Sequence, residues 1–275
     1  MPSRRAGADP EADDPAMQAR IAYDACPLCR SGNFTKIVDA DCSQHPLYQP
    51  VIPPVMHWMA CGDCGHVFTD GYFTDEAAAV IFSRVMEYQA VGWEMEKQRA
   101  IFSRIVERVS RHVADGVWLD IGFGNGSLLF TAAEYGFTPV GADLRQDNTQ
   151  ALIHAGIEGH CIDITKFDQQ GRFSVISMAD VLEHMPFPRE GLAAAHRLLN
   201  DDGILFLSMP NADCPLWRNL NARNANPYWG ELEHFHNFGR PRLYRFLEES
   251  GFRPVHYTIS ERYRVGMEII ARRVA

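Results

Sequence analysis

Short apolar runs alternate with amphipathic segments along most of the second half of the chain. The apolar runs predict strands at 117–121, 138–142, 159–162, 173–178, 203–209, 253–259 and 265–272. Apolar positions at helical spacing predict helices at 126–135, 147–156, 189–199 and 241–250. Short buried strands that alternate with helices are typical of a parallel sheet with helices on both faces. The pattern therefore predicts an α/β fold with a doubly wound, seven-stranded sheet.

The residues before this alternating region divide into three zones. Residues 1–20 are rich in Ala, Asp, Pro and Glu, which predicts a disordered tail. Residues 21–74 hold most of the cysteines and several prolines, and they predict a small ribbon. Residues 75–112 carry apolar positions at helical spacing. They predict two helices, a lid or linker between the ribbon and a main domain at 113–275.

The first strand of the main domain, 117–121, leads into a glycine-rich turn. Asp120 lies near its end, and Gly122, Gly124 and Gly126 follow at alternate positions. Glycine is required where backbone approaches a ligand closely or adopts a positive φ, and the next helix directs free N–H groups at such a ligand. The dinucleotide fingerprint, G-x-G-x-x-G, is spaced differently and usually lacks the acid. The acid suits a ligand with a cationic amine, such as S-adenosylmethionine (SAM); the alternative is an ordinary strand–helix turn.

Two further strands end in acids, Asp143 and Asp163. Ligands of doubly wound sheets bind at the carboxyl ends of the strands. Asp143 can accept both hydroxyls of a ribose there, and Asp163 can accept from an adenine amine while Ile164 packs on the ring. Any single acid at a strand end can instead cap a helix. Three acids at successive strand ends, beside a glycine turn, favour a ligand site.

Four cysteines form two C-x-x-C pairs, Cys26 with Cys29 and Cys61 with Cys64. This spacing lets two thiolates face one tetrahedral ion, and four thiolates close a structural Zn²⁺ site. A redox C-x-x-C needs only one pair, and disulfides are rare inside cells. The pairs therefore predict a zinc-binding ribbon that folds around its metal.

The net charge of −9 and the isoelectric point of about 5.6 disfavour a surface that grips phosphate backbones. The sequence has no apolar run near the ~20 residues of a membrane span, and no secretory signal is visible at the N-terminus. We therefore expect no nucleic-acid partner, no membrane contact and a cytoplasmic location.

The segments 120–126 and 177–186, together with Asp143 and Asp163, resemble the successive motifs of class I SAM-dependent methyltransferases. The resemblance covers about residues 75–275. It points to the small-molecule branch, which includes ubiquinone-biosynthesis O-methyltransferases and sugar and natural-product enzymes. It implies a Rossmann-like methyltransferase sheet that binds SAM and releases S-adenosylhomocysteine. The cysteine ribbon also resembles the zinc-binding N-terminal segment of some sugar C-methyltransferases.

The resemblance also implies which residues hold the cofactor. Backbone near Met178 and Ala179 would complete the site for the methionine part of SAM. The full set implied is Asp120, Gly122, Gly124, Gly126, Asp143, Leu144, Asp163, Ile164, Met178, Ala179 and Asp180.

Methyl transfer is an in-line displacement, and alignment supplies much of its rate. A hydroxyl acceptor also benefits from a base, and histidine titrates near neutral pH. The candidate bases are His184, His234 and His236. His184 can instead hold the local turn, and His236 lies in an insertion, 211–240, that we expect to cover the cleft.

Two groups of aromatic residues leave alternatives open. Tyr88 and Trp93, between the two bridging helices, either pack in the core or cover the ligand cleft. Trp217, Tyr228 and Trp229, in the insertion, either line an acceptor pocket or fold the insertion itself.

The sequence predicts SAM-dependent methyl transfer to a small-molecule acceptor, at oxygen of a sugar, natural product or related metabolite. Asp180, Glu183 and His184, with a downstream histidine, also resemble the Mg²⁺ cluster of small-RNA 2′-hydroxyl methyltransferases, with Asp in place of the first Glu. One alternative is thus an RNA-modifying methyltransferase whose zinc ribbon grips RNA, which would bind RNA in a salt-dependent way. Another is a non-catalytic SAM-binding scaffold whose ribbon docks a protein partner.

Overall fold

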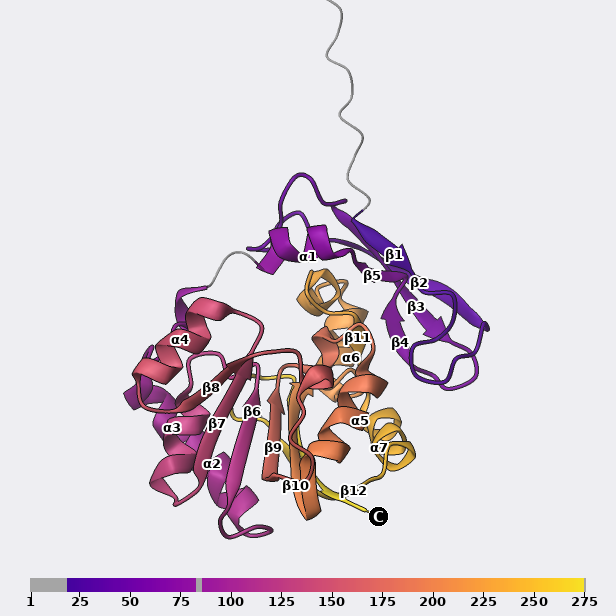
Figure 1. Cartoon of the computed structure of the whole chain (residues 1–275). Helices are drawn as coiled ribbons and strands as arrows, with labels where there is room; N and C mark the ends of the chain where they lie inside the picture. The colour runs from indigo at the N-terminus through magenta and orange to yellow at the C-terminus, as the bar shows by residue number, and fades with distance from the viewer. Residues whose placement is uncertain (1–18, 83–85, 275) are drawn as a thin grey trace, which may run out of the picture.

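The computed structural model describes residues 19–82 and 86–274. The tail predicted at 1–20 lies outside these residues except for its last two, and Arg20 begins strand β1 (Arg20–Ala22). The described chain forms an α/β domain and a smaller ribbon, drawn in indigo and purple, that lies over one end of it (Figure 1).

Seven strands form the main sheet, in the order β12-β13-β10-β9-β6-β7-β8. The strands β10, β9, β6, β7 and β8 run parallel, and β13 runs antiparallel to both of its neighbours. Their bounds are β6 (Val117–Ile121), β7 (Thr138–Asp143), β8 (Glu158–Cys161), β9 (Phe173–Ala179), β10 (Leu199–Pro210), β12 (Phe252–Ile259) and β13 (Gly266–Arg273). The predicted doubly wound, seven-stranded sheet is confirmed. The largest difference is at β10, which begins at Leu199 instead of residue 203.

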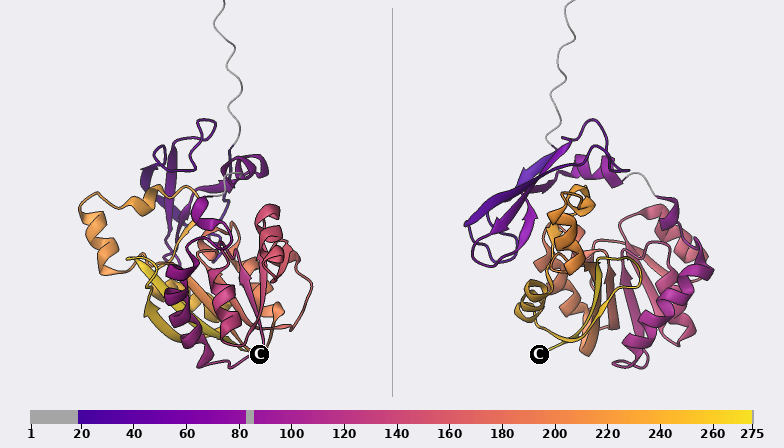
Figure 2. Two further views of the ribbon diagram at one scale, coloured as in Figure 1. Left: turned by 90° about the vertical axis from the view of Figure 1, so that its left-hand side faces the viewer. Right: turned by 180° about the vertical axis from the view of Figure 1, so that it is seen from behind.

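Helices cover both faces of this sheet (Figures 1 and 2). One face carries α2 (Met95–Ser110), α3 (Ser127–Glu134) and α4 (Gln146–His154); the other carries α5 (Pro188–Leu198) and α7 (Arg240–Glu249). Neighbouring residues of a strand enter different hydrophobic clusters. Trp118 packs with α2, α3 and α4, whereas Leu119 packs with α5 and α7. Burial on both faces explains why these strands appear in the sequence as continuous apolar runs.

The ribbon sheet extends beyond residues 21–74. Its strands β2 (Phe34–Asp41), β3 (Val55–Cys61) and β4 (Val67–Thr69) are antiparallel, and its fourth strand, β11 (His236–Asn237), comes from the far end of the sequence and pairs with β4. Phe68 of β4 lies in the same hydrophobic cluster as Phe238 and Phe246. The division predicted at residue 74 therefore marks a change in composition rather than a break in packing. The ribbon also contains β5 (Gly71–Phe73), which pairs with β1, and leads into α1 (Asp75–Phe82).

The segment between β10 and α7 packs onto the ribbon. It contains α6 (Pro215–Ala222), which projects from the body in the left view of Figure 2, and a short 3₁₀ helix, η4 (Pro227–Gly230). Trp217 is buried and stacks on Tyr228, with ring centroids 5.4 Å apart. Trp229 packs edge-on against Trp58 of β3 at 5.5 Å, and the Trp58 Nε1–H donates to the Trp229 carbonyl. These contacts favour the interpretation that the three aromatic residues fold this segment.

Candidate active site

The turn between β6 and α3 has the backbone geometry that its glycines predict. Gly122, Gly124 and Gly126 have φ values of +61°, +53° and +76°, in the left-handed region that favours glycine. A Cβ at Gly122 would lie 2.9 Å from a methyl group of Val181, whereas one at Gly124 would meet no atom within 4 Å. The turn therefore leaves open space beside Gly124, which suits close approach of a ligand to the backbone.

Asp120 lies beside this turn and is buried, with 3% of its surface exposed. The Ser177 hydroxyl donates to its Oδ1 at 2.5 Å, and the Trp118 indole N–H in turn donates to Ser177. Burial raises the pKa of Asp120 to about 7, although the Ser177 hydrogen bond opposes the shift. A buried carboxylate held in this way is suited to a cationic ammonium group.

Asp143 ends β7 and is also buried. The Arg145 guanidinium donates to both of its carboxylate oxygens, at 2.9 and 2.7 Å, and also to Gln89 at 2.9 Å. Gln89 belongs to η1 (Glu87–Gln89), in the segment between α1 and α2. Leu144, between Asp143 and Arg145, is 73% exposed. An apolar surface of this kind is available to a flat ring.

Asp163 follows β8 and caps the 3₁₀ helix η2 (Ile164–Lys166). Its Oδ1 accepts from the backbone N–H and the hydroxyl of Thr165, both at 2.8 Å. Ile164 is 2% exposed and lies in the hydrophobic core. One carboxylate oxygen of Asp163 therefore caps the helix, as the alternative interpretation predicts. Contact between the other oxygen and an adenine amine stays a proposal.

Three further residues implied in the cofactor site lie at the end of β9. Met178 is fully buried, and Ala179 is half-buried. Asp180 has a φ of +57°, and its carboxylate accepts from the Tyr263 hydroxyl at 2.8 Å and pairs with Arg262 at 2.7 Å. The side chain of Asp180 is thus held by the loop between β12 and β13, which leaves backbone as its contact for a ligand.

His184 and His234 lie together at the end of η3 (Leu182–His184). Their ring centroids are 4.7 Å apart and nearly perpendicular. His184 Nδ1 lies 3.1 Å from the Glu233 carbonyl oxygen. Because a carbonyl oxygen only accepts, Nδ1 carries the proton and Nε2 has a free lone pair. Nε2 is therefore the atom of His184 that could act as a base or bind a metal ion.

Glu183 and His234 are buried beside His184 with unpartnered polar atoms. Both carboxylate oxygens of Glu183 and the Nδ1 of His234 make no hydrogen bond with any residue that the structure describes. Burial, with the Asp180 charge second, raises the pKa of Glu183 well above its usual range. Burial also lowers the pKa of His234 far below that of a free histidine. Donor atoms of Glu183, His184 and His234 all lie within 4.8 Å of one another, so this set could hold a metal ion.

His236 is placed differently from His184. It is 1% exposed, its Nδ1 lies 3.0 Å from His66 Nε2, and its Nε2 lies 2.9 Å from the Met185 carbonyl. Burial lowers the pKa of His236 to about 4. Both ring nitrogens are therefore occupied by protein groups, which argues against direct contact with an acceptor.

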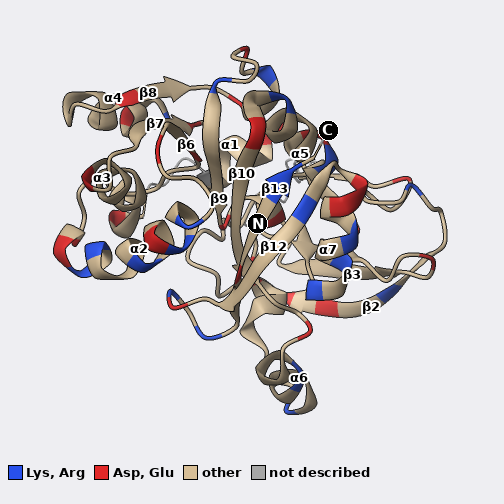
Figure 3. Ribbon diagram, turned by 90° about the horizontal axis from the view of Figure 1, so that it is seen from below, with Lys and Arg blue, Asp and Glu red and all other residues tan. Residues whose placement is uncertain are grey.

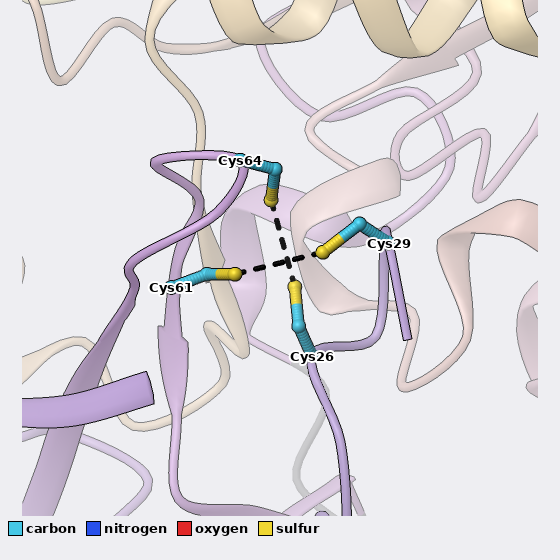
Figure 4. A group of neighbouring side chains, drawn as sticks. All are labelled: Cys26, Cys29, Cys61 and Cys64. Carbon is cyan, nitrogen blue, oxygen red and sulfur yellow. Dashed lines mark hydrogen bonds between the residues drawn. The ribbon is translucent and has the colours of Figure 1, made fainter. Parts of the chain in front are cut away.

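The four cysteines predicted as metal ligands converge on one point (Figure 4). Cys26 Sγ lies 3.7 Å from Cys64 Sγ, and Cys29 Sγ lies 3.5 Å from Cys61 Sγ. All four sulfur atoms lie within 4.8 Å of one another. Tetrahedral Zn–S bonds of about 2.3 Å place sulfur atoms about 3.8 Å apart. The residues therefore fit a four-thiolate zinc site.

Sequence reasoning missed several partners of these residues. Arg145 on Asp143 could have been noticed from its position two residues after the acid. Ser177 on Asp120, and Tyr263 and Arg262 on Asp180, come from other strands and loops and leave no local signal.

On the side shown in Figure 3, basic and acidic residues are interspersed along α2, whereas the arginines of α7 precede its glutamates. Across the described residues, no helix combines the length and apolar character that a membrane crossing requires.

The chain is similar to known methyltransferases. The family described as "Methyltransferase domain" matches residues 94–257. The ubiquinone biosynthesis O-methyltransferase of Nitrosococcus oceani is 30% identical over 169 residues, which cover 55% of this chain and 72% of the relative. That of Idiomarina loihiensis is 35% identical over 107 residues, covering 36% of this chain and 44% of the relative. The second of these relatives is thus matched over less than half of its length.

Solved structures share the fold. A 1,6-didemethyltoxoflavin-N1-methyltransferase of Burkholderia thailandensis, with S-adenosylhomocysteine bound, has a TM-score of 0.58 and 20% identity, and the match covers 78% of this chain and 98% of that one. The magnesium protoporphyrin IX methyltransferase of Synechocystis has a TM-score of 0.51 and 15% identity, covering 66% and 88%. The fold and the site define a class I SAM-dependent methyltransferase. This chain belongs to the methyltransferase-domain family, as the match over residues 94–257 shows.

Proposed function

We propose that this enzyme methylates a hydroxyl group of a small-molecule acceptor, such as a sugar, a natural product or a related metabolite. The observation that carries the proposal is the position of His184. This residue lies in the turn after β9, which pairs with β6, the strand that bears Asp120, and its Nε2 is free. The relatives named as O-methyltransferases act at oxygen, which supports the same chemistry here.

We assign the cofactor contacts to the ends of β6, β7 and β8. Asp120 would hold the ammonium group of SAM, and the open turn at Gly122 and Gly124 would admit its methionine part. Asp143 would accept the ribose hydroxyls in place of Arg145. Leu144 would cover the adenine, with Asp163 at its amine. When bound, SAM supplies a methyl group on a positively charged sulfur.

We assign the base to His184. Its Nδ1–H is held by the Glu233 carbonyl, so Nε2 is oriented to take the acceptor proton. His234 packs against this ring and keeps water from one side of it.

We propose that Cys26, Cys29, Cys61 and Cys64 bind one structural zinc ion. A site closed by four thiolates has no open position for substrate. The cytoplasm keeps such thiols reduced, and it is the compartment we propose for this enzyme.

Calorimetry with SAM tests the cofactor assignment. Asp143→Ala should weaken SAM binding roughly tenfold or more, because hydrogen bonds to a charged group contribute about 1.5–3 kcal/mol. Asp147→Ala, an exposed acid in the first turn of α4, is the control and should bind as the wild type does. An unchanged dissociation constant for folded Asp143→Ala would refute the assignment, and binding of NAD in place of SAM would refute the whole interpretation.

Transfer of a labelled methyl group from SAM tests the acceptor class. Small hydroxyl compounds should be labelled, and RNA should not. Labelling of RNA with salt-dependent binding would favour the RNA-modifying alternative. SAM binding without transfer to any acceptor would favour the non-catalytic scaffold.

A further inference from the structure

Strand β11 lies between the ribbon and the turn that carries His184. On one side, His236 and Asn237 pair with Phe68 and Val67 of β4. On the other, the Phe235 N–H donates to the Glu183 carbonyl at 2.9 Å, and His236 Nε2 lies 2.9 Å from the Met185 carbonyl. The turn at 183–185 is thus hydrogen-bonded to a strand that belongs to the ribbon sheet.

The His236 ring links this turn to the ribbon through side chains as well. Because the Met185 carbonyl only accepts, His236 Nε2 carries the proton and Nδ1 is the acceptor. His66 Nε2–H therefore donates to His236 Nδ1, at 3.0 Å. Both rings are 1% exposed. A chain of two directed hydrogen bonds thus runs from His66 through His236 to the Met185 carbonyl.

His66 is fixed by the second cysteine pair. It lies two residues after Cys64, and its carbonyl accepts from the Cys61 N–H at 2.9 Å. Gly65, with a φ of +71°, closes the turn by donating to the Cys61 carbonyl at 3.0 Å. The backbone of His66 is therefore hydrogen-bonded to that of Cys61 in the same tight turn.

We propose that the four-cysteine ribbon positions the catalytic base: the thiolate cluster fixes His66, His66 orients His236, and His236 with strand β11 sets the turn that holds His184. His236 is then a positioning residue, and the four cysteines, which would hold the zinc ion, influence the reaction without touching the reacting groups. This inference rests on the proposed zinc site and on the proposed base.

Hydrogen exchange on the full-length protein tests the coupling without any substrate. Removing zinc with a chelator should speed exchange of the His184 and Phe235 amides at least about tenfold. The Gly122 amide, which donates to Ala142 at 2.7 Å inside the main sheet, should be unchanged. Unchanged exchange at His184 and Phe235 in zinc-free protein would overturn the proposal. Equal acceleration at Gly122 would also overturn it, because the whole chain would then be loosening.

Substitutions at His236 test the same coupling through kinetics. His236→Phe keeps a ring but removes both hydrogen bonds, and it should lower kcat at least about tenfold while the SAM dissociation constant stays within twofold. His236→Gln offers a donor and an acceptor again and should recover most of kcat. His57→Phe, at a ribbon histidine whose side chain is 41% exposed and paired with Asp39, is the matched control and should behave as wild type.

The two sets of results separate the possible failures. Wild-type kcat in His236→Phe, or loss of SAM affinity in proportion to kcat, would overturn the positioning role. If the purified protein holds no zinc, the zinc assignment fails, and the His236 variants still decide the rest. If no acceptor is methylated, the exchange measurements still decide whether the ribbon sets the turn.

Discussion

The cofactor end and the acceptor end of this site are built in different ways. At the cofactor end, the carboxylates of Asp143 and Asp163 are held by residues two positions away in the sequence. At the acceptor end, His184 is held by a carbonyl 49 residues away, and His236 by a histidine 170 residues away. Asp120 and Asp180 accept from Ser177 and Tyr263, which are 57 and 83 residues away but still belong to the main sheet and its loops. The cofactor end is therefore built within the main domain, whereas the acceptor end depends on how the main domain packs against the ribbon. Damage to the ribbon should accordingly affect the acceptor end and spare the cofactor end.

Removal of a zinc ligand should have the largest effect. Cys61→Ser should abolish zinc binding, since apparent binding energies of structural zinc are about 10–16 kcal/mol in small zinc-finger peptides. We expect the ribbon to unfold and methyl transfer to be lost, with SAM affinity kept within about threefold. Elemental analysis measures the zinc content, and calorimetry measures the SAM affinity. Cys42→Ser, at a buried ribbon cysteine outside the cluster, should keep its zinc. A parallel loss of SAM binding in Cys61→Ser would show that the two ends are not separate.

Substitution of the base should have the next largest effect. A positioned base contributes about 10²–10⁴-fold, so His184→Ala should lower kcat at least about tenfold. SAM affinity should barely change. His154→Ala, an exposed histidine of α4, serves as the control. If His184→Ala keeps near-wild-type kcat at saturating acceptor, catalysis is by alignment alone and the base assignment must be abandoned.

The cofactor end should respond to pH through Asp120. Its pKa of about 7 in the ligand-free protein means that SAM affinity should fall as pH drops below about 7, because the ammonium group needs the ionised carboxyl. Asp120→Asn should weaken SAM roughly 10- to 100-fold at pH 8 and flatten this dependence. A pH-independent affinity in the wild type would place the ammonium group elsewhere.

The same carboxyl has an opposite effect on the stability of ligand-free protein. The folded state holds the Asp120 proton more tightly than the unfolded chain, so its contribution is fully present below about pH 4 and is lost as pH rises to about 7. Asp120→Asn should therefore unfold less readily than wild type at pH 8, measured with denaturant in the absence of SAM. If the free energy of unfolding of the wild type rose relative to that of Asp120→Asn between pH 4 and 7, this assignment would be contradicted.

The smallest effect is expected at Arg145. Its side chain is 21% exposed and occupies the carboxylate that we assign to the ribose. Arg145→Ala should strengthen SAM binding by about threefold, since the ribose hydroxyls would no longer compete with the guanidinium and a hydrogen bond contributes a net of roughly 0.5–1.5 kcal/mol. Calorimetry with SAM, run in parallel on Asp143→Ala, measures this change in affinity. A clear loss of affinity would mean that Arg145 itself binds the cofactor.

The same contrast explains how far the sequence could be interpreted. The seven strands, the glycine turn and the acids at the strand ends are local features, and the sheet they predict is the one observed. The four cysteines converge as their spacing predicts. The pairing of β11 with β4 left no signal, because a two-residue strand has no period and its partner is far away in the sequence. For the same reason His236 could be named only as a candidate base, and its bonds to His66 and Met185 needed the structure.

The late position of β11 in the sequence has a consequence during synthesis. Strand β4 leaves the ribosome about 170 residues before its partner, which is roughly 10–30 s at typical rates of translation. For that time the nascent three-stranded sheet β2–β3–β4 has an open edge at β4, and such edges pair readily with other chains. β4 is short, with only Val67, Phe68 and Thr69, which limits the surface available for wrong pairing. The open edge of β4 is thus short, and it is covered by β11 only when the last third of the enzyme has been synthesised.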